Sequence, residues 1–290
     1  MRLRTLPLSL SGIILGSAAA FHNSYWDTLV FMLAMGTTIS FQVLSNFAND
    51  LGDSQKGTDN SYRIGPMRSV QSGEISKSTM KKAVILTSVI SFILAGLLIY
   101  FASKNMSIST IWFYIVLSIL SVFAAISYTV GKKAYGYHGL GDLMVLFFFG
   151  GVSVLGVYSL YAPEFLPENI LLAVFVGLLS VAVLNLNNMR DYINDKASGK
   201  NTLVVKMGPN MAKIYHSFLI LFGLGALIMY FLNTSNNDLF FSLFPALFLM
   251  LHLKKVLATK KAKEFDPELK KVALLTFSIS VLIAIGLFVS

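Results

Sequence analysis

Residues 169–199 decide the fold, and they read NILLAVFVGLLSVAVLNLNNMRDYINDKASG. The first part, 169–188, is mostly apolar and reaches about the twenty residues that a helix needs to cross the hydrocarbon core of a bilayer. The run then ends in Asn187 and Asn188 and in a charged cluster that contains Asp191 and Asp195. Carboxylates at the edge of a membrane span are expensive and are often functional. This stretch therefore predicts a transmembrane helix that ends in a candidate site.

The composition of the whole chain agrees with a membrane protein. Of 290 residues, 55% are apolar and only 13% are charged, against roughly 25% charged in an average soluble domain. A soluble globule so poor in charge could not cover its own surface. The absence of Cys excludes a disulfide framework, a thiolate nucleophile and Cys-ligated metal sites.

Apolar runs of sufficient length recur along the chain, so we predict an all-α membrane protein with nine transmembrane helices. The whole chain, 1–290, is expected to form one transmembrane domain. The first run has no cleavage site of small residues and is interpreted as a span, not as a signal peptide. The predicted spans are 6–22, 28–48, 83–103, 108–130, 140–161, 169–188, 211–232, 238–253 and 272–289.

Basic residues predict the orientation of these spans. Of the 23 Lys and Arg residues, Lys104 is the only one expected on the side of the short links; the others lie with the N-terminus, which carries Arg2 and Arg4, and with the long loops. Lys and Arg accumulate on the cytoplasmic side, so we expect the N-terminus to be cytoplasmic and the C-terminus outside. The net charge of +9 is then explained by topology, without a nucleic-acid partner. The long loops expected on the cytoplasmic side are 49–82, 131–139, 189–210 and 254–271.

Two matched acidic clusters follow the second and sixth predicted spans. Both begin with Asn-x-x-x-Asp, which places two side chains on one face of a helix, and both continue with Asp-x-x-x-Gly. The duplication predicts an internal pseudo-repeat with two acidic sites on one side of the membrane. The paired residues are Asn46 and Asp50, Asp53 and Gly57, Asn187 and Asp191, and Asp195 and Gly199.

These acids lie where the helix macrodipole is negative, so a carboxylate there is disfavoured unless a cation neutralises it. Oxygen ligands suit a hard ion, and Mg²⁺ usually binds through a few carboxylates together with substrate phosphates. The alternative is that the acids only cap helices or solvate a loop. A single acid would favour that alternative, and the duplication favours the metal.

Cations in the same loops are candidate partners for a diphosphate. The alternative for each is the ordinary cytoplasmic bias of basic residues, and for the tyrosines of loop 131–139, such as Tyr135, an interfacial aromatic belt. Tyr128, Tyr135 and Tyr137 could instead flank an aromatic acceptor. The candidate cations are Arg63, Arg68, Lys132, Arg190, Lys196 and Lys200.

Five segments carry a resemblance to the UbiA superfamily of intramembrane prenyltransferases, and within it to the naphthoate (MenA) type. The sequence departs from the usual family pattern at Leu51-Gly52, where a Tyr commonly follows Asn-Asp. The segments are Arg4-Thr-Leu-Pro-Leu-Ser-Leu-Ser-Gly, Asn49-Asp50-x-x-Asp53 with Lys56-Gly-Thr-Asp59, Gly65-Pro-Met-Arg68-Ser-Val-Gln-Ser-Gly73, Tyr135-Gly-Tyr-His-Gly-Leu-Gly-Asp142, and the run from Asn187 to Asn201.

The resemblance implies nine helices around a central cavity, with both acidic motifs facing it from the cytoplasmic side. It implies that Asp50, Asp53, Asp191 and Asp195 are catalytic and hold Mg²⁺, with two ions expected on the prenyl diphosphate. Asn46, Asn49, Asp59 and Asn187 would support them, and the six cations named above would contact the diphosphate.

The expected reaction transfers a polyprenyl group from an allylic diphosphate to 1,4-dihydroxy-2-naphthoate. Diphosphate and CO₂ leave, and demethylmenaquinol forms in menaquinone biosynthesis in a bacterial inner membrane. One alternative is a prenyltransferase with another acceptor, such as 4-hydroxybenzoate. A different class is a cation-coupled transporter, since paired intramembrane acids can mark an ion path. The residues leave open the prenyl chain length, the oligomeric state and the group that binds the acceptor carboxylate, for which Arg4 and the loop lysines are candidates.

Overall fold

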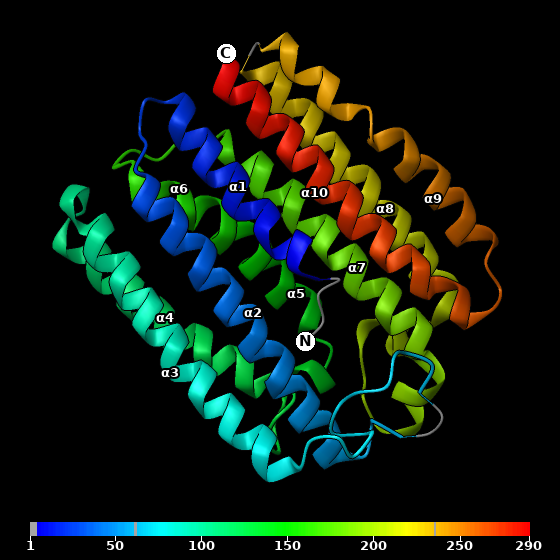
Figure 1. Cartoon of the computed structure of the whole chain (residues 1–290). Coiled ribbons are helices and arrows are strands. Elements are labelled where there is room, and N and C mark those ends of the chain that lie inside the picture. Colours follow the sequence, from blue (N-terminus) through cyan, green and yellow to red (C-terminus); the bar gives the residue numbers. More distant parts are fainter. Residues whose placement is uncertain (1–4, 61–62, 235) are drawn as a thin grey trace.

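The computed structural model describes residues 5–60, 63–234 and 236–290, and within this part the chain contains helices and no strand (Figure 1). Arg2 and Arg4 lie outside the described residues. The α-helices are α1 Leu6–His22, α2 Thr28–Lys56, α3 Lys77–Ala102, α4 Ile108–Ser127, α5 Gly141–Val145, α6 Val157–Tyr161, α7 Asn169–Ala197, α8 Leu203–Asn233, α9 Ala246–Ala258 and α10 Phe265–Val289. Shorter turns of helix are η2 Ser103–Asn105, η3 Tyr135–Tyr137, η5 Asn237–Leu243 and η6 Ala262–Glu264, and a π-helix, η4, spans Leu146–Gly156.

Each of the nine predicted spans coincides with helix in the described residues. Eight of them are long and apolar enough to cross a membrane, and the remaining one, α1, has 17 residues. The predicted span 140–161 is a composite of α5, η4 and α6, and the predicted span 238–253 begins as η5 before Pro245 opens α9. The protein is therefore an integral membrane protein.

Helix α7 occupies the centre of the bundle. It packs against α8, α10 and η4, and Phe175, Leu179 and Leu186 are completely buried. Gly150 of η4 meets α7 so closely that a Cβ there would lie 2.4 Å from the Ala173 carbonyl oxygen. Small residues at such crossings let helices approach closely inside a membrane.

The outer helices present apolar side chains to their surroundings. Ile93 of α3 is 58% exposed and Trp112 of α4 is 61% exposed. Water would oppose such exposure over whole helices, whereas lipid chains are as apolar as these side chains. Figure 1 shows α3 and α4 side by side along one edge of the bundle, with α9 along the opposite edge.

Helices α2 and α7 continue about two turns past the predicted ends of their spans. The aspartates therefore stand on helices, whereas loops had been expected to begin at 49 and 189. Helix α2 continues because Leu51, Gly52 and Asp53 are buried by neighbours, and it ends at Gly57, whose φ of 72° is left-handed. Helix α7 ends in the same way before Gly199, whose φ is 71°.

The connections that follow α2 and α7 lie together at one end of the bundle, and the C-terminus lies at the other end (Figure 1). Gly208 and Pro209 form a kink inside α8, with non-helical backbone angles at Gly208. The architecture thus carries both acidic motifs on two inner helices to the same end.

Candidate active site

A cavity of 780 Å³ extends into the bundle from the end that carries the two acidic motifs. Its polar end is lined by Asp50, Asp53 and Arg68, and its walls farther in include Phe149 and Leu160. A polar mouth above an apolar chamber fits a ligand with a charged head and a hydrocarbon body.

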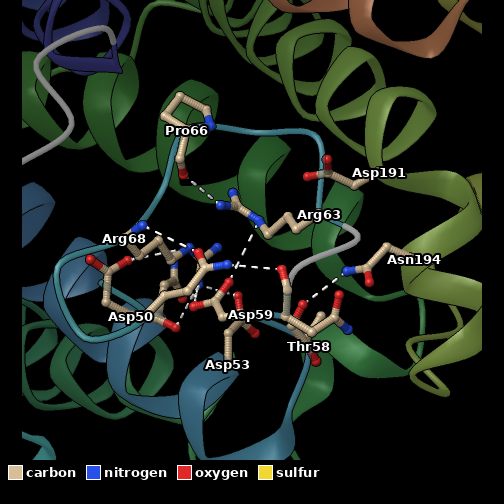
Figure 2. Close-up of polar contacts among 12 residues, drawn as sticks. Asp50, Asp53, Thr58, Asp59, Arg63, Pro66, Arg68, Asp191 and Asn194 are labelled. Atoms are coloured by element: carbon tan, nitrogen blue, oxygen red, sulfur yellow. Dashed lines mark hydrogen bonds and ion pairs between the residues drawn. The ribbon is translucent and has the colours of Figure 1, made fainter. Parts of the chain in front are cut away.

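Arg68 is the centre of the first acidic cluster (Figure 2). Its Nη1 atom lies 2.5 Å from Oδ2 of Asp53 and 3.0 Å from Oδ2 of Asp59, and its Nε atom lies 3.5 Å from Oδ1 of Asp50. Burial opposes the charge of the guanidinium, yet the three carboxylates raise the pKa of Arg68 above its usual value. Burial raises the pKa of Asp59, and Arg68 counteracts part of that effect. One arginine is thus shared by three acids, and Asp59 also pairs with Arg63, whose Nε atom lies 3.5 Å from Oδ1 of Asp59.

Tyr137 contacts the same cluster from η3. Its hydroxyl donates to Oδ1 of Asp53 over 2.7 Å and is hydrogen bonded to Oγ1 of Thr58 over 2.6 Å. The Nζ atom of Lys56 lies 3.8 Å from the centre of the Tyr137 ring, within the range of a cation–π contact. Burial and the neighbouring Asp53 raise the pKa of the Tyr137 phenol, which therefore stays a donor. Tyr135, by contrast, donates to the Ala124 carbonyl oxygen over 2.8 Å and lines the cavity.

Arg190 organises the second acidic cluster. It donates to both carboxylate oxygens of Asp191, over 2.9 Å from Nε and 2.6 Å from Nη2. Its Nη2 atom also donates to Oδ1 of Asn187 over 2.8 Å, and its Nη1 atom lies 2.5 Å from Oδ1 of Asp266 in α10. Such two-pronged pairing is the strongest form of an arginine–carboxylate contact. Asp191 is therefore masked by its neighbour.

Asp195 is less well compensated than Asp191. Its Oδ1 atom lies 3.8 Å from Nζ of Lys200, and its buried Oδ2 atom has no hydrogen-bond partner among the described residues. A buried carboxylate oxygen without a partner is costly, so this atom can accept a further cation or donor.

The loop that follows α2 joins the two clusters. Nδ2 of Asn194 in α7 donates to the Thr58 carbonyl oxygen over 2.9 Å. A Cβ on Gly65 would lie 2.6 Å from Nη2 of Arg190, so a larger residue there would force this guanidinium or the loop to move. Figure 2 shows Arg63 between the Arg68 cluster and Asp191; its Nη1 atom donates to the Pro66 carbonyl oxygen over 2.7 Å.

The structure brings together most of the residues predicted for the site. Three of the predicted acids do not line the cavity, because cations that contact them lie between them and it: Asp59, Asp191 and Asp195. The lysines at positions 132 and 196 are exposed and do not line the cavity either. The predicted residues that line the cavity are Asn46, Asn49, Asp50, Asp53, Arg63, Arg68, Tyr135, Asn187, Arg190 and Lys200.

A metal site is not assembled in this arrangement. Within 5–60, 63–234 and 236–290, no three His, Asp or Glu side chains are grouped closely enough to hold an ion. In this arrangement Arg68 contacts Asp50, Asp53 and Asp59, and Arg190 contacts Asp191. The donor set still fits a hard cation, because it consists of carboxylate and amide oxygens and includes the unpartnered oxygen of Asp195.

Sequence reasoning did not identify three contributors to this site. Thr58 and Gly65 stand in segments that carry the family resemblance, but their contacts are made by the Thr58 backbone and by close packing at Gly65, which the sequence pattern does not reveal. Asp266 lies 76 positions from the arginine that it contacts, in the first turn of α10 and within the predicted loop 254–271. Gly52 packs closely against the chain near Thr129, because a Cβ there would lie 2.5 Å from Oγ1 of Thr129; nothing in the structure explains Leu51 in place of the usual Tyr.

The chain is similar in sequence to known proteins. The model of the "UbiA prenyltransferase family" matches residues 6–285. The chain is 42% identical, over 94% of its length and 86% of the relative, to a 1,4-dihydroxy-2-naphthoate octaprenyltransferase of Escherichia coli (strain K12). It is 40% identical, over 99% of its length and 94% of the relative, to the protein of the same name from Haemophilus influenzae.

Two solved structures share the fold. An apo structure of a UbiA homolog from Aeropyrum pernix K1 superimposes with a TM-score of 0.72 at 18% identity, covering 100% of this chain and 98% of that one. A UbiA homolog from Archaeoglobus fulgidus, bound to DMAPP and Mg²⁺, gives a TM-score of 0.59 at 14% identity, covering 98% and 99%. At these identities the likeness concerns the fold alone.

Proposed function

The chain belongs to the UbiA prenyltransferase family, and we propose that it transfers a polyprenyl group from an allylic diphosphate to 1,4-dihydroxy-2-naphthoate. The observation that carries this proposal is the 40–42% identity, over almost the whole chain, to enzymes named for that acceptor. The cavity, with two acid–arginine clusters at its mouth and apolar walls behind, supports it. The product would be demethylmenaquinol, an intermediate of menaquinone biosynthesis.

The cations at the cavity mouth would bind the diphosphate. Arg63, Arg68, Arg190 and Lys200 line it, and guanidinium groups pair with phosphate oxygens through two parallel hydrogen bonds. The arginines are held in place by aspartates, so they are oriented before the substrate arrives. Positive groups here stabilise the charge that develops on the leaving oxygen as the C–O bond breaks.

We propose Mg²⁺ as the cofactor, with two ions held by Asp50, Asp53, Asp191 and Asp195. The amide oxygens of Asn46, Asn49 and Asn187 and the carboxylate of Asp59 would support these ligands. When bound, Mg²⁺ neutralises the diphosphate and makes it a better leaving group. A solved relative of the same fold is described as bound to DMAPP and Mg²⁺, which supports this choice.

Within the cavity, the ring carbon that bears the acceptor carboxylate attacks the first carbon of the allylic group. The C–O bond to diphosphate breaks, and its electron pair stays on the diphosphate oxygen that leaves. CO₂ then leaves the same ring carbon, and the electrons of that C–C bond restore the aromatic ring. The apolar wall around Phe149 and Leu160 would exclude water from the allylic cation and receive the first part of the tail.

The placement in the membrane is part of the proposal. Nine spans, a cytoplasmic N-terminus and an outer C-terminus would place the site at the cytoplasmic face of a bacterial inner membrane, within one domain of 1–290. The bias of Lys and Arg toward the ends that carry the site supports this orientation.

The test is a paired assay with the purified protein in lipid, Mg²⁺ and a polyprenyl diphosphate. One reaction receives 1,4-dihydroxy-2-naphthoate, the other receives 4-hydroxybenzoate, and both diphosphate and CO₂ are measured. We expect diphosphate and CO₂ in equal amounts with the naphthoate only. Release of diphosphate without CO₂ in the benzoate reaction would mean that the acceptor is 4-hydroxybenzoate. Absence of diphosphate in both reactions would favour a cation-coupled transporter.

A further inference from the structure

Helix α2 carries a row of polar side chains inward from the acidic cluster. Gln42, Asn46 and Asp50 follow one another at intervals of four residues, and all three line the cavity. Residues four apart share a helix face and differ by about 6 Å in height. The row therefore continues the polar mouth by two further steps into a chamber that is otherwise mainly apolar.

Two hydrogen bonds hold Gln42 in a fixed orientation, one to Ser9 of α1 and one to Thr5, the residue that precedes α1. Its Oε1 atom accepts from Oγ of Ser9 over 2.6 Å, and its Nε2 atom donates to Oγ1 of Thr5 over 3.0 Å. Ser9 and Thr5 also line the cavity. An amide carries two donor hydrogens and two acceptor lone pairs, so each end of the Gln42 amide retains capacity for one more hydrogen bond.

Asn46 provides the second observation that indicates a ligand. The residue is 5% exposed, and among the described residues its Nδ2 atom has no hydrogen-bond partner. A buried amide without a partner is unfavourable, most of all inside a membrane. A ligand in the cavity that accepts a hydrogen bond from this amide would remove the deficit.

The chemistry of the two proposed substrates decides which of them binds here. A polyprenyl tail is a hydrocarbon and can satisfy neither amide. The acceptor carries two hydroxyls at opposite sides of a ring and a carboxylate beside one of them, and it must approach the carbon that is attached to the diphosphate. The Gln42–Asn46 row begins one helical turn from Asp50, which is where such a ring would lie.

Other residues of the cavity lining suit a flat aromatic ring. Phe41 of α2 and Phe148 and Phe149 of the π-helix η4 line the same cavity. Aromatic side chains pack against rings in offset or edge-on arrangements. The cavity lining thus combines the polar row of α2 with phenylalanine rings against which a hydroxylated ring can pack.

From this juxtaposition we propose that Gln42, positioned by Ser9 and Thr5, and Asn46 form the subsite that recognises the hydroxyl and carboxylate groups of the aromatic acceptor. This inference rests on the proposed function, because it names how that acceptor is bound. It makes Gln42 a specificity-determining residue that the sequence pattern did not single out.

The experiment compares Gln42→Leu with Gln55→Leu, a matched change at an exposed position of the same helix. Steady-state kinetics are measured in lipid for each substrate, and acceptor binding without prenyl diphosphate is followed by the fluorescence of the naphthoate. We expect Gln42→Leu to raise the KM and the Kd of the acceptor about tenfold or more, as loss of a buried hydrogen bond predicts. The KM of the prenyl diphosphate should stay as in Gln55→Leu.

A second measurement guards against a merely structural effect. Ser9→Ala should weaken acceptor binding in the same direction but less, because it loosens Gln42 without removing it. Analogues that lack one hydroxyl should bind worse than the full acceptor to the unsubstituted protein, and Gln42→Leu should reduce that discrimination. A change in packing alone would not be expected to reduce the discrimination between the acceptor and its analogues.

Three outcomes would overturn the subsite. The first is an unchanged KM and Kd of the acceptor in Gln42→Leu, and the second is an equal rise in the KM of both substrates. The third is unchanged discrimination between analogues in Gln42→Leu, which would mean that only water fills the space beside Gln42 and Asn46. The proposed function is judged separately, by turnover of the unsubstituted protein with each acceptor. If 4-hydroxybenzoate proves to be the substrate, the same comparison of variants is made with that acid.

Discussion

Replacement of Arg68 by Met should change the stability of the protein in a way that depends on divalent cations. Methionine retains much of the side-chain length but removes a guanidinium that lies 2.5 Å from Asp53, 3.0 Å from Asp59 and 3.5 Å from Asp50. Arg68 is only 9% exposed, so water cannot replace it. Three carboxylates would then repel one another at the end of α2.

The magnitude follows from the removal of one partner of a buried ion pair, which costs about 3–5 kcal/mol. For a chain of this size each kcal/mol lowers the transition temperature by about 2–4 °C, so the expected decrease in chelator is on the order of 10 °C. Mg²⁺ should bind the released carboxylates and restore part of the loss, because a ligand of the folded state stabilises it.

The assay is thermal unfolding in detergent or lipid at one fixed heating rate, in EDTA and then with increasing Mg²⁺. Lys132→Met, at an exposed position of loop 131–139, is the control for loss of one positive charge. The reasoning is refuted if Arg68→Met and Lys132→Met unfold at the same temperature in EDTA. It is equally refuted if Mg²⁺ stabilises Arg68→Met no more than it stabilises the unsubstituted protein.

Three other predictions concern the site and its support. Asp50→Ala or Asp191→Ala should abolish turnover while the protein still elutes as a folded species, and EDTA should abolish the turnover of the unsubstituted protein reversibly. Full activity of the double variant, or activity without divalent ions, would contradict the metal assignment. Gly65→Ala should lower kcat/KM for the prenyl diphosphate by about tenfold or more, because its Cβ would lie 2.6 Å from Nη2 of Arg190; unchanged kinetics would show that the loop yields. Glu268→Gln should lower the transition temperature by about 5 °C or more, since it removes the charge that meets one histidine and two lysines at 2.6–2.9 Å; an unchanged melting curve would show that the cluster contributes nothing.

Much of the fold follows from the sequence because lipid imposes a simple rule. A segment of about twenty apolar residues must satisfy its own backbone, and a helix does so. All nine predicted spans are helical within the described residues. The lengths were less predictable, since α2 and α7 extend past their apolar parts. Those extensions are stabilised by contacts from remote loops, such as the contact of Arg68 with Asp53, and hydropathy does not register them.

In the site, too, the features that depend on neighbouring residues could be predicted from the sequence, and the contacts between distant residues could not. The Asn-x-x-x-Asp spacing placed Asn46 and Asp50 on one helix face, and both line the cavity. By contrast, Tyr137 is 84 positions from Asp53, its hydrogen-bond partner. The roles assigned to individual residues stay predictions. Lys132 and Lys196 belong to the right loops, but both are exposed, because a positive-inside bias does not distinguish a substrate contact from a solvated lysine.

The π-helix η4 has a consequence for how chains of this kind diverge in length. A wide turn accommodates an extra residue in a helix, so removal of one residue within 146–156 would allow the segment to tighten into α-helix. Every side chain beyond the deletion would then turn by about 100° around the axis. Tyr161, whose hydroxyl lies 3.0 Å from Oγ of Ser17, would lose that partner, and new side chains would rotate toward the chamber. Insertions and deletions in this one segment are thus a route to differently shaped chambers on an unchanged scaffold.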